Sequence, residues 1–117
     1  MIGVAKVQSV TGSPVTPVYS VSLSPGRIDV LSGNGSATSP RAFSTVKNGI
    51  GPYTYSWVVT GIDININSET SDSTTFFASG FDSSYTETAT LTVTDTGNGN
   101  AQTSKQITVR FDFESGA

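Results

Sequence analysis

The feature that most constrains the fold of this chain is a strict two-residue alternation between Glu87 and Asp95. Its apolar members are Ala89, Leu91 and Val93, and its polar members are Thr88, Thr90, Thr92 and Thr94. Successive side chains of a β-strand point to opposite faces of a sheet, whereas a helix would scatter these residues around its axis. The segment therefore predicts a strand with one face in an apolar core and the other in water.

Two further segments show the same alternation. Between Tyr53 and Thr60, one predicted face carries Tyr53, Tyr55, Trp57 and Val59, and the other carries Thr54, Ser56 and Val58. Between Gln102 and Phe113, the predicted inward positions are Ile107, Val109, Phe111 and Phe113. The turn Gly-Asn-Gly-Asn at 97–100 supplies residues that tolerate a positive φ, so the segments on either side of it are predicted to form a hairpin. The predicted core residues are Tyr53, Tyr55, Trp57, Leu91, Val93, Ile107 and Val109.

The rest of the chain favours short strands over helices. Gly or Pro interrupts almost every window that a helix would need, and β-branched residues dominate between them. The shorter predicted strands are Val4–Val10, Val18–Leu23, Arg27–Leu31, Ala42–Lys47, Asp63–Asn67 and Thr74–Ala78. The segment Ser32–Pro40 is predicted to be a flexible loop. Short strands at close spacing predict an all-β fold, a two-sheet antiparallel β-sandwich of about seven to nine strands.

The length of 117 residues predicts a single domain. Within it, residues 18–113 are assigned to the sandwich and residues 114–117 to a frayed tail. Residues 1–17 are interpreted either as an extra edge strand or as an arm that pairs with a partner. The chain begins at Met1 without a signal peptide or a transmembrane run, which suggests a complete small protein made in the cytoplasm. A piece cut from a larger surface protein would have the same features. The absence of Cys leaves the compartment open.

The charge pattern argues against two classes of partner. The net charge is −3, and the six basic residues are scattered through the chain. No cluster of Lys and Arg is available to neutralise a run of phosphates, so binding to nucleic acid is not expected. Binding to an anionic membrane surface is not expected for the same reason.

The sequence also argues against catalysis, because it contains neither His nor Cys. Their absence removes the Ser-His-Asp triad, thiol nucleophiles and the usual zinc ligands. We therefore predict no enzymatic activity, no catalytic residue, no cofactor and no metal. Asp112 and Glu114 share one face of a predicted strand, but small sandwiches rarely form the pocket of a glycosidase, so both are interpreted as solvated. Asp95 is interpreted as a turn residue that accepts backbone N–H bonds, not as a metal ligand.

One segment has the opening of a calcium-binding loop. Asp63, Asn65 and Asn67 follow the D-x-N-x-N pattern, but the sixth residue is a serine and the twelfth a threonine where such loops need Gly and Glu. The alternation instead predicts that these polar residues face solvent while Ile64 and Ile66 face the core. Binding of Ca²⁺ by this segment or by the turn 95–100 is left open.

The stretch that leads into the predicted central strand, and includes its first residues, resembles a known family. The residues from Asn48 to Trp57, Asn-Gly-Ile-Gly-Pro-Tyr-Thr-Tyr-Ser-Trp, resemble the G-x-x-P-Y-x-Y-x-W signature of PKD and related bacterial immunoglobulin-like domains. The strand Thr88–Asp95 is similar to their T-L-T-V-T-D strand, and residues 107–109 to their closing strand. The resemblance covers about residues 18–113 and implies an immunoglobulin-like sandwich. The loops 63–73 and 81–86 depart from the family pattern.

The resemblance implies a role for the aromatic residues. It places Trp57 in the core of the sandwich, where the alternative is an exposed platform for a sugar ring. The directions of Tyr19, Phe81 and Tyr85 are less constrained by the pattern. If Phe81 and Tyr85 lie on an exposed loop, they are the best candidates for contact with a partner, the alternative being packing within the loop.

Domains of this family occur in tailed-phage virions, bacterial surface proteins and secreted polysaccharide-degrading enzymes. The resemblance therefore implies a non-catalytic structural or interaction module. The preferred hypothesis is a virion accessory protein on a phage capsid or tail, made in the host cytoplasm, with a capsid or tail protein or a cell-surface glycan as partner. The alternative is a spacer or weak carbohydrate-binding module from a bacterial adhesin or polysaccharide-degrading enzyme, acting outside the cell or on its surface.

Overall fold

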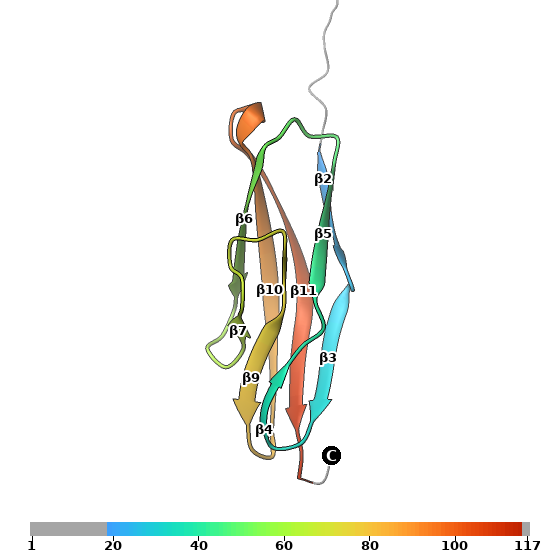
Figure 1. Ribbon diagram of the computed structural model, residues 1–117, viewed down its shortest axis with the longest axis vertical. Helices are drawn as coiled ribbons and strands as arrows, with labels where there is room; N and C mark the ends of the chain where they lie inside the picture. The colour runs from blue at the N-terminus through green and yellow to red at the C-terminus, as the bar shows by residue number, and fades with distance from the viewer. Residues whose placement is uncertain (1–18, 116–117) are drawn as a thin grey trace, which may run out of the picture.

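The computed structural model describes residues 19–115 of the chain (Figure 1). Its strands are β2 (Ser20–Ser24), β3 (Arg27–Ser32), β4 (Gly35–Thr38), β5 (Ala42–Lys47), β6 (Tyr53–Val59), β7 (Asn65–Ile66), β8 (Ser73–Thr74), β9 (Phe76–Gly80), β10 (Ser83–Asp95) and β11 (Ala101–Phe113). A 3₁₀ turn, η1 (Thr96–Asn98), joins β10 to β11. The all-β prediction is confirmed. The predicted strand Val4–Val10, and the choice between an edge strand and an arm for residues 1–17, lie outside the described residues.

The strands form one larger and two smaller sheets. The larger sheet has the order β3-β11-β10-β6, and its pairs are antiparallel except that β3 runs parallel to β11. The smaller sheets, β2-β5-β8 and β4-β9-β7, are antiparallel. The prediction of two purely antiparallel sheets is therefore wrong in these details. The parallel pair arises because the chain crosses from one sheet to another at Pro25-Gly26 (Figure 1). Before this point β2 pairs with β5, and after it β3 pairs with β11.

One apolar core is shared by all three sheets. Its buried members come from β2, β3, β5, β6, β9, β10 and β11 and from the loop before β7. Trp57 on β6 is only 1% exposed, and its ring meets the Phe76 ring of β9 edge-on at a centroid distance of 5.9 Å. The indole Nε1 donates a hydrogen bond of 2.8 Å to the Ser71 carbonyl. The strands thus enclose a common core in the manner of a β-sandwich.

The central hairpin is longer than the sequence predicted. β10 starts at Ser83 instead of Glu87, and its register with β11 runs from Ser83 opposite Phe113 to Asp95 opposite Ala101. The residues before Glu87 lack the apolar/Thr alternation, but the end of β11 provides a full backbone partner for them. On β6 the alternation predicts the faces correctly, since odd-numbered residues from Tyr53 to Val59 point inward and even-numbered ones are exposed.

Three of the shorter predicted elements differ from the structure. The predicted flexible loop Ser32–Pro40 contains β4, which pairs with β9 through the register Gly35–Gly80 to Thr38–Phe77. The predicted strand Asp63–Asn67 is reduced to β7, although Ile64 is buried as expected. The predicted strand Thr74–Ala78 is divided between β8 and β9, because one part pairs with β5 and the other with β4 and β7.

Candidate functional site

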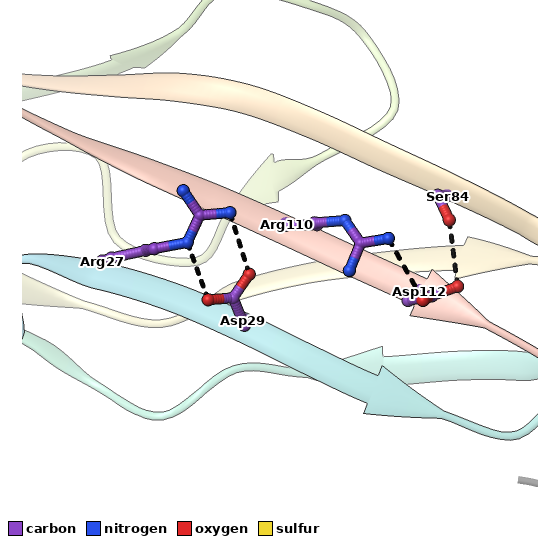
Figure 2. Close-up of polar contacts among 5 residues, drawn as sticks. All are labelled: Arg27, Asp29, Ser84, Arg110 and Asp112. Atoms are coloured by element: carbon purple, nitrogen blue, oxygen red, sulfur yellow. Dashed lines mark hydrogen bonds and ion pairs between the residues drawn. The ribbon is translucent and has the colours of Figure 1, made fainter.

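Four charged side chains of β3 and β11 form a row on the outer face of the larger sheet, near the end where β11 terminates (Figure 2). Arg27 on β3 binds Asp29 with two hydrogen bonds, 2.7 Å from Nε and 3.1 Å from a terminal nitrogen. Asp29 lies in register with Arg110 of the neighbouring β11. Arg110 in turn binds Asp112 at 3.2 Å, and the Ser84 hydroxyl of β10 donates to Asp112 at 2.9 Å. Positive and negative groups therefore alternate across the strands.

The positive and negative side chains of the row neutralise one another. The hydrogen bond from Arg27 is the main cause that lowers the pKa of Asp29 below its usual value. Desolvation opposes it, and the charges of Arg27 and then Arg110 add smaller lowering contributions to this pKa. The same hydrogen bond, which Asp29 accepts, is the main cause that raises the pKa of Arg27. Both side chains are about half exposed, at 53% and 52%, so water and salt screen the pair. The row therefore offers polar recognition groups and little stabilisation.

A solvent-open recess of about 430 Å³ lies where this row reaches the end of the sheet. The residues that line it are Asp82, Ser83, Ser84, Asp112, Phe113, Glu114 and Ser115, of which three carry a carboxylate and three a hydroxyl. Asp112 is bound to Arg110 and Ser84 at the edge of the recess.

Asp82 ties three separate segments together beside the recess. Its carboxylate accepts hydrogen bonds from the Asn34 side-chain amide and the Ser115 backbone N–H, each at 3.1 Å. Its backbone N–H donates to the Asn34 side-chain carbonyl at 2.9 Å. The loop between β3 and β4, the turn between β9 and β10, and the chain after β11 therefore meet at one residue.

The two aromatic residues predicted to contact a partner have different surroundings. Phe81 lies in the turn between β9 and β10 and is 74% exposed. Tyr85 lies within β10, is half-buried, and packs against the Phe113 ring at a centroid distance of 6.1 Å. The expectation of a loop position is therefore wrong for Tyr85, because the extension of β10 turns its side chain toward the core. Leu31, in register with Asp112, adds a second exposed apolar side chain at 68%.

Two buried carboxylates on β10 hold the loops on either side of β6. Asp95 is fully buried and accepts the backbone N–H groups of Ile50 and Gly51, both at 2.9 Å. Its predicted role as an acceptor of backbone bonds is confirmed. Glu87 is 6% exposed and accepts three backbone N–H groups, from residues 61, 63 and 64, at 3.0 Å each. Sequence analysis missed Glu87, although its inward position in the alternation was a usable signal.

All seven residues predicted to form the core belong to the core cluster or pack against it. Trp57, Leu91, Val93, Ile107 and Val109 are buried, and Tyr53 and Tyr55 are half-buried against the same cluster. Desolvation is the main cause that raises the pKa of Tyr55, followed by the negative charge of Asp72 and an interaction with Tyr53. Tyr19, whose direction the pattern left undetermined, is buried, and its hydroxyl lies 2.9 Å and 2.7 Å from the carbonyl oxygens of Val93 and Ala101.

The polar side chains of the calcium-like segment do not gather around a common site. Asp63, Asn65 and Asn67 are exposed. The Asn67 amide donates to the Thr75 hydroxyl at 2.6 Å. Within residues 19–115, no group of three or more carboxylate, His or Cys side chains is placed to hold a metal ion. Within the same range, no helix has the length and hydropathy needed to cross a bilayer.

Comparison of the chain with protein-family models, with curated proteins and with solved structures gives no match.

Proposed function

We propose that the chain is a non-catalytic interaction module with an immunoglobulin-like fold of the PKD type. Immunoglobulin-like domains place strands C, F and G side by side and bury a Trp on strand C. The adjacent strands β6, β10 and β11 and the buried Trp57 on β6 support this assignment. The absence of His and Cys from the sequence supports a non-catalytic role.

The proposed role is that of an accessory protein on a phage capsid or tail, which binds a virion protein and displays the rest of its surface to solvent. A row of Thr side chains along the outer face of β10 gives the module a polar, uncharged coat. The net charge of −3 favours solubility over unspecific association.

The observation that carries the proposed interaction is the position of Phe81. Phe81 is a large aromatic side chain that is 74% exposed, so most of its apolar surface is in contact with water. Exposed aromatic residues on a braced turn are typical anchors of protein interfaces, because they bury a large area at a low cost in conformational entropy. The turn that carries Phe81 is braced by Asp82 and Asn34, so the ring is presented on a fixed support.

The test compares two exposed apolar residues in different loops. Phe81→Ser should lower the amount of protein recovered with purified virions at least about tenfold, the effect of losing an interface anchor. The matched control is Ile62→Ser, because Ile62 is 93% exposed and lies in the loop between β6 and β7. Electron microscopy of the wild-type particle should show density at symmetry-related positions. Recovery of the protein only as a secreted cellular product would refute the proposal, and equal recovery of both variants would exclude Phe81 as the anchor.

A second candidate function is weak binding of a carbohydrate, and the recess beside Asp82 favours it. Carboxylate and hydroxyl groups pair well with sugar hydroxyls, and the residues that line the recess include three of each kind. A glycan array probed with the wild-type chain and with Ser84→Ala tests this candidate. Signals that fall in the variant would support it, and a blank array would exclude it.

A further inference from the structure

Three Asn-Gly pairs occur in the sequence, at 34–35, 48–49 and 98–99. In such a pair the glycine backbone nitrogen attacks the Asn side-chain carbon Cγ, ammonia leaves, and a five-membered succinimide forms. Water then opens the ring at either carbonyl and leaves aspartate or isoaspartate. Glycine lacks the Cβ that would hinder the attack, so the three pairs have the same intrinsic chemistry. Any difference in rate between them must come from the structure.

The first pair is held by its surroundings. The Asn34 amide nitrogen donates to the Asp82 carboxylate at 3.1 Å, and the Asn34 side-chain oxygen accepts the Asp82 backbone N–H at 2.9 Å. Both ends of the Asn34 amide are therefore engaged by one residue. For Cγ to turn toward the nitrogen of Gly35, these two bonds must open first.

The third pair is restrained by its backbone. Asn98 is the last residue of η1, and Gly99 is its C-cap. Hydrogen bonds between residues three apart keep the backbone of a 3₁₀ turn in a helical conformation. That conformation holds the amide nitrogen of the following residue away from the side chain that it must reach. The pair is therefore less reactive than the same dipeptide in an extended loop.

The second pair has neither the side-chain hydrogen bonds of the first nor the 3₁₀ turn of the third, although Asn48 has a positive φ of 64°. Asn48 is exposed and follows the end of β5, outside any strand or 3₁₀ turn. Among residues 19–115, neither the Asn48 side chain nor the Gly49 N–H makes a hydrogen bond, whereas the next two N–H groups are bound by Asp95. We propose that Asn48 is the site of spontaneous conversion to aspartate and isoaspartate in this protein, and that Asp82 protects Asn34 from the same reaction.

The product at position 48 has a structural consequence. Isoaspartate adds one atom to the backbone directly before Gly49, whose Cα packs so closely on Tyr53 that an added Cβ would clash with the tyrosine oxygen. The two N–H groups bound by Asp95 follow immediately. The longer backbone therefore displaces these donors from a buried carboxylate, and the modified protein should unfold at a lower urea concentration.

The experiment follows all three sites in one sample. The full chain is incubated at mildly alkaline pH, folded or in urea, and the conversion of each Asn is measured by peptide mass spectrometry. In urea the three rates should be similar. In the folded protein Asn48 should convert roughly tenfold faster than Asn34, the factor expected when the two exposed hydrogen bonds of Asn34 must open at a combined net cost of about 1.4 kcal/mol. Equal rates for Asn48 and Asn34 in the folded protein would overturn the proposal.

Two variants at one position test the protection of Asn34. Asp82→Gly keeps the positive φ of 46° accessible but removes the carboxylate, so the Asn34 rate should rise toward the Asn48 rate. Asp82→Asn keeps an acceptor oxygen and should leave the Asn34 rate low. The Asn48 rate should be the same in both variants. An unchanged Asn34 rate in a folded Asp82→Gly protein, checked by circular dichroism, would show that the Asp82 carboxylate gives no protection.

Discussion

The two ends of β10 use the same chemistry in different surroundings. At one end Asp95 accepts two backbone N–H bonds inside the protein, and at the other Asp82 accepts two hydrogen bonds in contact with solvent. Water replaces the partners of an exposed carboxylate when they are lost, but it does not reach the partners of a buried one. Burial therefore decides how much each aspartate contributes to stability.

The surroundings of the two ends support this difference. Near Asp95, the buried Tyr19 joins the start of β2 to the hairpin between β10 and β11 through its hydroxyl, and its ring packs on Tyr53 at a centroid distance of 6.4 Å. Near Asp82, the recess is open and Phe81 is exposed. One end is closed by internal contacts, and the other keeps polar and aromatic groups available to a partner.

The largest effect is expected from Trp57, which lies between the two ends and supports both. Trp57→Ala should lower the free energy of unfolding by roughly 3–5 kcal/mol, because the cavity left by the indole cannot collapse. Urea unfolding monitored by far-UV circular dichroism measures the change. A loss below about 1 kcal/mol would mean that the two ends are stable without a shared core. It would contradict the role of Trp57 as a support of both ends.

A smaller effect is expected from Asp95→Asn, and it tests the comparison directly. The amide presents an N–H group to one of two backbone donors, so the free energy of unfolding should fall by about 2–3 kcal/mol. The matched variant Asp82→Asn keeps an acceptor oxygen for both of its partners, and the change should stay within about 0.5 kcal/mol. Equal losses in the two variants, measured in urea, would contradict the role assigned to burial.

The smallest effect is expected from the exposed ion pair of Arg27 and Asp29. The pKa of Asp29 is lower in the folded than in the unfolded chain, so the pair stabilises the fold above the ordinary carboxyl range and loses this contribution as the pH falls through the folded pKa. Arg27→Ala should raise the pKa of Asp29 toward its ordinary value, as measured by an NMR titration of the side-chain carboxyl. An unshifted titration would mean that Arg110 alone lowers the pKa.

The sequence predicted the elements whose side chains alternate, and it failed where pairing alone makes the strand. β6 and β11 could be predicted with their faces because each row of large apolar residues needs a core. β4 could not, since its residues Gly-Ser-Ala-Thr have no apolar face and become a strand only by pairing with β9. The contact of Asn34 with Asp82 joins positions 48 residues apart, and no local pattern marks it. Glu87 was recognisable only as a charge in an inward position.

The parallel pairing of β3 with β11 has a mechanical consequence. The described chain enters β2 near η1 and leaves β11 at the opposite end, and β3 and β11 run in the same direction between these points (Figure 1). Tension applied to Tyr19 and to Phe113 pulls the neighbouring strands β3 and β11 in opposite directions along their length. The hydrogen bonds between them then share the force together instead of breaking one after another, so extension of the chain is resisted in shear.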